Sequence, residues 1–153
     1  MDEVVELELP ARPDVLALAR LVVGAAAAGE PLFDEERIDD LRLAVSEACT
    51  NAIEAQLVRG GRGEDSQPIV VRCRLTAGRV EVEVRDHGGG FDQATLPLHP
   101  PVADPSRLHY ERGLGIPLIR MLSDAVEFRR TAEGTAVVMT FEPRPLPDPK
   151  PIT

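Results

Sequence analysis

A short segment of the chain, SEACTNAIEAQ, holds a carboxylate, Glu47, and an amide, Asn51, one helical turn apart. Side chains four residues apart lie on the same face of a helix, so both groups would point the same way. An amide oxygen is a neutral ligand suited to Mg²⁺, and a carboxylate could accept a proton from a hydroxyl or water. The small neighbours Ala48, Ala52 and Ala55 would leave room beside them. The alternative interpretation is a solvated helix face.

The segment RDHGGGFD contains a second candidate group, with Asp86, Gly88 and Gly90 in the pattern D-x-G-x-G. Glycine allows positive φ and lets the backbone approach a planar ligand closely. Asp86 follows an apolar strand pattern, and its carboxylate could accept a hydrogen bond from an exocyclic amine such as that of adenine. A tight turn with a solvated aspartate is the competing interpretation.

Two further segments could contact the same ligand. In ERGLGIPLIRMLSD, Gly113 and Gly115 stand just before a predicted helix, whose free N–H groups and positive dipole end would face a phosphate. In EGTAVVMTF, Thr135 begins a predicted strand. The first segment could instead be a simple junction between loop and helix. The Thr135 hydroxyl could instead form a hydrogen bond with a backbone group at the edge of the strand.

Hydrophobic periodicity predicts the elements that must position these groups. Apolar residues alternate with acidic ones at residues 5–9, which predicts a strand. A helix from Pro13 to about Ala28 should end at Gly29. Asp34 should cap a second helix, whose apolar side is formed by Ile38, Leu41, Val45, Ala48 and Ala52.

The rest of the chain is predicted to be rich in strands. In chain order we expect a β-hairpin over 69–75 and 80–86, a weakly periodic stretch over 92–111, a helix over 115–124 and strands over 125–130 and 135–142. Strands and helices are thus clustered, which favours an α+β two-layer sandwich with helices on one face of a largely antiparallel mixed sheet. Residues 1–142 would form the domain, and the Pro-rich residues 143–153 an extended or disordered tail.

The composition limits the classes of function. A chain of 153 residues with 43% hydrophobic and 28% charged residues fits one soluble globular domain. The net charge of −9 argues against nucleic acid or an anionic membrane as a direct partner. Lys150 is the only lysine, so the chain has no P-loop. Cys49 and Cys73 fit buried reduced thiols, and no signal peptide or membrane-spanning run is evident, so we expect a cytoplasmic protein.

In combination and in this order, the segments resemble the ATP-binding fold shared by DNA gyrase B subunits, histidine kinases, heat-shock chaperones and mismatch-repair proteins, the GHKL or Bergerat fold. LAVSEACTNAIEAQ and ERGLGIPLIRMLSD resemble the bacterial anti-sigma-factor serine/threonine kinases within that superfamily. The resemblance covers roughly residues 5–142. It implies ATP and Mg²⁺ as cofactors, and a sigma factor and an anti-sigma-factor antagonist as partners; it also allows a homodimer.

The resemblance also implies a role for each matching residue. Glu47 matches the general base, Asn51 the Mg²⁺-binding asparagine and Asp86 the aspartate that reads adenine. Residues 92–111 match the ATP lid. The other implied nucleotide-binding positions are Gly88 and Gly90 in the adenine pocket, Arg112, Gly113, Leu114, Gly115 and Ile116 at the phosphates, and Thr135 near the adenine.

One position departs from the family pattern. Many relatives carry a histidine four residues after the asparagine, and this chain has Ala55 there. The departure removes a basic group from the vicinity of the phosphates, and Arg112 could replace it. ATP binding therefore follows more directly from the resemblance than phosphoryl transfer does.

Three functions remain open at this point. The first is a kinase that phosphorylates a serine or threonine of an anti-sigma-factor antagonist and also sequesters a sigma factor. The second is a nucleotide-binding anti-sigma or regulatory module with little or no turnover. The third, a histidine kinase catalytic domain, is disfavoured, because no phospho-accepting helical segment precedes the domain in these residues and because Glu47 stands where histidine kinases usually carry an amide.

The predicted lid generates a test. Residues 92–111 include four prolines and show little apolar periodicity, so this stretch should bury little surface by itself. We expect backbone hydrogen exchange across 92–111 to be fast without nucleotide and to slow when Mg·ATP is added. Equally slow exchange in both conditions would contradict the assignment of a lid.

Overall fold

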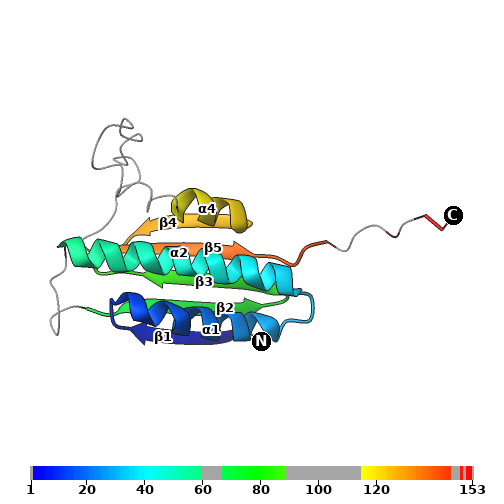
Figure 1. Cartoon of the computed structure of the whole chain (residues 1–153), viewed down its shortest axis with the longest axis horizontal. Coiled ribbons are helices and arrows are strands. Elements are labelled where there is room, and N and C mark those ends of the chain that lie inside the picture. Colours follow the sequence, from blue (N-terminus) through cyan, green and yellow to red (C-terminus); the bar gives the residue numbers. More distant parts are fainter. Residues whose placement is uncertain (1, 60–66, 89–114, 146–148, 150, 153) are drawn as a thin grey trace.

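The computed structural model describes residues 2–59, 67–88, 115–145, 149 and 151–152. They form a five-stranded sheet with the helices packed on one face, which confirms the predicted α+β two-layer fold (Figure 1). The elements are β1 (Glu3–Leu9), a 3₁₀ turn η1 (Pro13–Val15), α1 (Leu16–Ala28), α2 (Glu35–Arg59), β2 (Ile69–Thr76), β3 (Arg79–Arg85), α4 (Gly115–Leu122), β4 (Ala125–Arg130) and β5 (Thr135–Phe141).

The strand order is β1-β2-β3-β5-β4, and every pairing among these strands is antiparallel. The predicted parallel component is absent from the described sheet for a topological reason. β3 and β4 run in the same direction, but β5 lies between them, so they do not pair. The same insertion places the start of β5 beside the end of β3, and therefore Thr135 beside Asp86.

The β2–β3 hairpin closes through a two-residue turn at Ala77 and Gly78. Both residues have positive φ, 43° and 80°. Such a turn matches the right-handed twist of the two strands and fixes their register. Cys73 therefore lies opposite Val82. Because side chains alternate between the faces of a sheet, this register points both residues at the helices.

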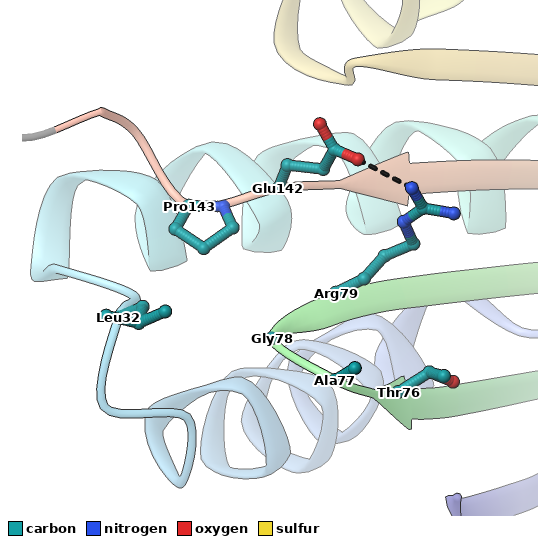
Figure 2. Close-up of a pocket in the computed structure, with 7 residues that line it drawn as sticks. All are labelled: Leu32, Thr76, Ala77, Gly78, Arg79, Glu142 and Pro143. Carbon is teal, nitrogen blue, oxygen red and sulfur yellow. Dashed lines mark hydrogen bonds and ion pairs between the residues drawn. The ribbon is translucent and has the colours of Figure 1, made fainter.

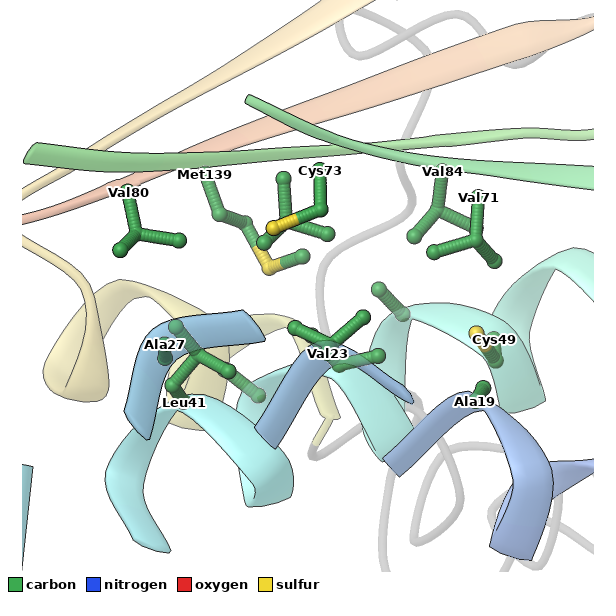
Figure 3. Close-up of a cluster of buried hydrophobic side chains, with 14 of the residues drawn as sticks. Ala19, Val23, Ala27, Leu41, Cys49, Val71, Cys73, Val80, Val84 and Met139 are labelled. Atoms are coloured by element: carbon green, nitrogen blue, oxygen red, sulfur yellow. The ribbon is translucent and has the colours of Figure 1, made fainter. Parts of the chain in front are cut away.

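The hydrophobic core fills the space between the sheet and the helices. Figure 3 shows side chains from β2, β3 and β5 meeting those from α1 and α2, among them Val71, Cys73, Val80, Val84, Met139, Ala19, Val23, Ala27, Leu41 and Cys49. Both cysteines are free and buried, as predicted. Burial raises the pKa of Cys49 to about 12 and that of Cys73 to about 11, so both thiols stay protonated at neutral pH.

Helix α2 begins where the sequence predicts, since Asp34 Oδ1 accepts a hydrogen bond from Arg37 N–H at 2.7 Å. The Arg37 side chain is itself buried, with 6% of its surface exposed. Its guanidinium donates to the carbonyl oxygens of Leu122 and Glu142, at 2.8 and 2.9 Å, and forms an ion pair with Asp124. Arg37 therefore ties the start of α2 to the end of α4 and to the end of β5.

We expect Arg37→Met to lower the free energy of unfolding by about 3 kcal/mol, because it leaves two carbonyl oxygens and Asp124 without their charged donor. Urea denaturation followed by circular dichroism would measure the change. Arg129→Met is a matched control, since the Arg129 side chain is 54% exposed and pairs with Glu127 at the surface. The control should change stability by less than about 0.5 kcal/mol. Equal effects of the two substitutions would contradict the role of Arg37.

Candidate functional site

The carboxylate and the amide of α2 face the first residue of α4. Glu47 and Asn51 are half-buried on the same side of α2, as predicted. A Cβ atom at position 115 would lie 2.8 Å from Glu47 Oε2 and 3.4 Å from Asn51 Nδ2. Glycine at position 115 is therefore what allows the α4 N-terminus to reach these two side chains. The geometry brings a carboxylate, an amide and a helix N-terminus to one place.

The alanines of α2 have a different role from the one expected. Ala48 and Ala52 are buried in the core, with 1% and 4% of their surface exposed, so they make room for packing against other elements rather than for a ligand. Ala55 is half-buried and contacts the D-x-G turn. A Cβ atom at position 88 would lie 2.8 Å from the Ala55 carbonyl oxygen. Gly88 thus allows the turn after β3 to pack directly on α2.

Asp86 lies just beyond β3 and is 8% exposed. Its Oδ1 accepts hydrogen bonds from Gly88 N–H at 2.9 Å and from Thr135 N–H at 3.3 Å. Burial raises the pKa of this carboxyl, and the two N–H donors and the charge of nearby His87 oppose that shift. Both of these hydrogen bonds go to Oδ1, and Oδ2 accepts none from the described residues, so a ligand donor could reach it.

The turn before β5 packs directly on Asp86. A Cβ atom at position 134 would lie 2.1 Å from the Asp86 carbonyl oxygen, so only glycine fits there. This contact of Gly134 was not predicted from the sequence. A glycine directly before a candidate ligand-binding residue, Thr135, was the signal that could have revealed it.

The Thr135 hydroxyl is an unsatisfied polar group beside this carboxylate. Thr135 is 5% exposed, and its Oγ1 has no hydrogen-bond partner among the described residues. A buried hydroxyl without a partner is costly, and most buried polar groups have one. A ligand with polar atoms next to Asp86 would supply the missing bond. The pair Asp86 and Thr135 therefore fits an adenine ring.

Sequence analysis missed two further residues at this end of the sheet. Gln56 is 1% exposed; its side chain donates to the Gln67 carbonyl oxygen and accepts a hydrogen bond from His87 N–H at 3.1 Å. His87 lies between Asp86 and Gly88. No spacing rule connects residues this far apart in sequence, so only the folded structure reveals the contact.

Several predicted site residues lie outside the described part of the chain. These are Gly90, Arg112, Gly113, Leu114 and the lid, 92–111. Ile116 is described and is half-buried in the first turn of α4.

The described residues contain no group of three His, Cys, Asp or Glu side chains that could hold a metal ion. A cation at Asn51 would therefore take most of its ligands from nucleotide phosphates and water. Mg²⁺ commonly binds in this way, retaining several waters and using one or two protein ligands. Asn51 beside the α4 N-terminus fits such an ion.

A separate cavity of about 410 Å³ lies at the opposite end of the sheet (Figure 2). It is lined by Leu32, Thr76, Ala77, Gly78, Arg79, Glu142 and Pro143. Arg79 and Glu142 form an ion pair across it at 2.7 Å. These residues stand at the start of β3 and just after β5, whereas Asp86 and Thr135 stand at the other ends of the same strands. The cavity is therefore separate from the candidate site.

None of the helices within the described ranges is long and apolar enough to span a bilayer.

Comparison with known proteins extends over most of the chain. A family model described as a histidine kinase-like ATPase domain matches residues 9–141. The serine-protein kinase RsbW of Bacillus pumilus is 36% identical over 142 residues, covering 90% of this chain and 85% of that protein. The protein of the same name from Bacillus subtilis is 36% identical over 141 residues, covering 89% of this chain and 83% of its own length.

A solved structure supports the fold independently. The crystal structure of the RsbU and RsbW domains of a Mycobacterium tuberculosis protein matches 94% of this chain and 33% of that larger chain, with a TM-score of 0.64 and 22% identity. The family match covers the segments that carry Glu47, Asn51, Asp86, Gly115 and Thr135. The chain belongs to the histidine kinase-like ATPase family and, within it, to the family of RsbW serine-protein kinases.

Proposed function

We propose that this protein is an ATP-dependent kinase that phosphorylates a serine or threonine of an anti-sigma-factor antagonist and also sequesters a sigma factor. One observation carries the catalytic part of the proposal: Gly115, at the α4 N-terminus, packs against both Glu47 and Asn51. That contact supports a site in which the helix end binds phosphate, Glu47 acts as general base and Asn51 holds the metal ion. The name of these relatives, serine-protein kinase, supports serine as the acceptor.

The nucleotide would span the two halves of the site. Its adenine would lie against Asp86 and Thr135, donating its exocyclic N–H to Oδ2 of Asp86. Its phosphates would lie at the α4 N-terminus, where free N–H groups and the helix dipole favour negative charge. The further residues proposed to contact the nucleotide are Gly88, Gly90, Arg112, Gly113, Leu114, Gly115 and Ile116.

Phosphoryl transfer would take place beside Glu47. The acceptor oxygen attacks the γ-phosphorus, the bond from this phosphorus to the β–γ bridging oxygen breaks, and ADP leaves. Glu47 accepts the proton of the attacking hydroxyl. Mg²⁺, bound through Asn51 and phosphate oxygens, would neutralise charge that develops on the phosphates. The protein contributes mainly by holding the acceptor hydroxyl, the phosphates and Glu47 in the geometry that transfer requires.

The alanine at position 55 favours a second candidate function. Many relatives carry a histidine at this place, and Ala55 supplies no basic group there. A nucleotide-binding anti-sigma or regulatory module with little turnover would need no such group. Phosphate transfer to an antagonist by the wild-type protein decides between the two functions.

The remaining parts of the proposal concern organisation. Residues 1–142 would form the kinase domain, and residues 143–153 a tail. The protein would act in the cytoplasm on protein partners, without direct contact with nucleic acid or membrane. Its net charge of −9 supports the last point.

We expect Asp86→Asn to weaken ATP binding by about 1.5–3 kcal/mol, roughly ten- to a hundred-fold. The asparagine oxygen can still accept the N–H groups of Gly88 and Thr135, but its amide nitrogen cannot accept the adenine N–H. Selectivity for ATP over GTP should fall as well. Titration calorimetry with Mg²⁺ present would measure both effects. Unchanged affinity and selectivity would exclude Asp86 as the adenine reader, and no binding by the wild type would overturn the proposed function.

We expect Glu47→Gln to slow phosphoryl transfer by roughly 10²–10⁴-fold, because the amide keeps the shape but cannot accept the proton. ATP affinity should change little. Asn51→Ala should differ, reducing Mg·ATP affinity and turnover together through loss of the metal ligand. The measurements are transfer of labelled phosphate to candidate antagonists and calorimetry of nucleotide binding. Transfer by Glu47→Gln at the wild-type rate would exclude Glu47 as the base. Sigma-factor binding should survive this substitution.

A further inference from the structure

His87 connects three separate elements at the edge of the adenine pocket. Its backbone N–H donates to Gln56 Oε1 of α2 at 3.1 Å. Its Nδ1 lies 2.9 Å from the carbonyl oxygen of Pro68, just before β2. Its Nε2 lies 3.0 Å from Glu133 Oε2, in the turn between β4 and β5. The ring is half-buried, whereas the Glu133 side chain is 73% exposed.

The two ring contacts cannot both be satisfied by a neutral imidazole. A carbonyl oxygen and a carboxylate oxygen can only accept hydrogen bonds, and neutral histidine carries a single ring N–H. If that proton is on Nδ1, it bonds Pro68, and the Nε2 lone pair faces the Glu133 carboxylate. The imidazolium form carries both protons and donates to both acceptors. In the other neutral tautomer, Nε2–H donates to Glu133 and the Nδ1 lone pair faces the Pro68 carbonyl oxygen, so only the protonated ring satisfies both contacts at once.

The contact with Glu133 bears directly on the adenine pocket. Glu133 precedes Gly134, which packs on the Asp86 backbone, and Thr135, which donates to the Asp86 carboxylate. Two hydrogen bonds close the turn: Gly134 N–H donates to Thr131 Oγ1, and Thr131 N–H donates to the Gly134 carbonyl oxygen, both at 2.9 Å. A shift of Glu133 would therefore move its two neighbours, Gly134 and Thr135, which contact Asp86.

We propose that His87 is a positioning residue of the adenine pocket, whose protonated ring holds the β4–β5 turn, through Glu133, against Asp86. The inference rests on the proposed binding of ATP. Among the described residues, the charged groups that the ring meets are Glu133 from the turn and Asp86 from the preceding position. α2 and the segment before β2 face His87 with neutral acceptors, Gln56 Oε1 and the Pro68 carbonyl oxygen.

The pH dependence of ATP affinity tests the proposal. Calorimetry would compare the wild type with Glu133→Gln from about pH 5.5 to about pH 8.5, where histidine titrates. A glutamine amide can donate to the neutral ring nitrogen, so Glu133→Gln should keep the pocket in place at high pH. At each pH we would take the ratio of the two dissociation constants. The effects of titrating the ATP phosphates and Asp86 cancel in this ratio, because both proteins share them. We expect this ratio to change about two- to five-fold across the range, the size expected for an exposed ion pair.

Glu127→Gln is the matched control. Glu127 is also exposed and also pairs with a cation, Arg129 at 2.9 Å, but it lies on β4 away from the pocket. This variant loses the same charge and should follow the wild-type pH profile. Thermal unfolding of each protein at each pH would confirm that all three remain folded.

A second measurement follows the ring itself. Nuclear magnetic resonance of the histidine rings, with the His87 signal assigned by its loss in His87→Asn, should show that ATP binding changes the ring environment in the wild type. The change should be smaller in Glu133→Gln, in which the ion pair to the ring is lost.

Two outcomes would overturn the proposal, and they are distinguishable. If the wild type and Glu133→Gln bind ATP with the same pH dependence, His87 does not position the pocket, while the proposed kinase function stands. If the wild type binds no ATP at any pH, the proposed function fails and this inference fails with it.

Discussion

The close approach of neighbouring segments at three glycines is the constraint on which the candidate site depends. Gly115 allows the α4 N-terminus to reach Glu47 and Asn51, Gly134 allows the β4–β5 turn to cover Asp86, and Gly88 allows the D-x-G turn to rest on α2. Segments distant in sequence thus meet without intervening side chains. Ordinary packing would keep them apart by the width of at least one methyl group. The candidate site therefore depends on the absence of a side chain at these three glycines as well as on its functional groups.

Two polar groups of the candidate site are buried at a cost in free energy, which other parts of the fold must offset. Asp86 is a buried carboxylate with a raised pKa, and the Thr135 hydroxyl is buried without a partner among the described residues. Both features cost free energy in the protein alone, and a bound polar ligand would offset this cost. The other end of α2 is organised differently, because Arg37 satisfies its neighbours with several hydrogen bonds. At one end of α2, therefore, the buried charge of Arg37 has hydrogen-bond partners. The other end lies beside the candidate site, where the Thr135 hydroxyl has none among the described residues.

Sequence reasoning predicted most of the architecture, because the elements have clear periodicity and clear ends. The Asp34 cap, the stop at Gly29 and the alternation in β2 and β3 were all confirmed. The missed features are long-range contacts. Gln56 and His87 meet only after the sheet has formed, and the role of Gly134 depends on β5 being inserted beside β3. Ala48 and Ala52 were misinterpreted because a small residue can make room for a ligand or for a neighbouring strand or helix, and the pattern is the same in both cases.

The buried cysteines have a practical consequence for following motion in this protein. Thiolate, rather than thiol, reacts with maleimides, disulfides and oxidants. With pKa values of about 12 for Cys49 and about 11 for Cys73, the thiolate fraction at neutral pH is about one in 10⁴ or less, and both sulfurs are also shielded by the core. A single cysteine introduced at an exposed position should therefore be labelled selectively in the natural background. Fluorescent or spin probes could then report on distances across the domain without replacement of either native thiol.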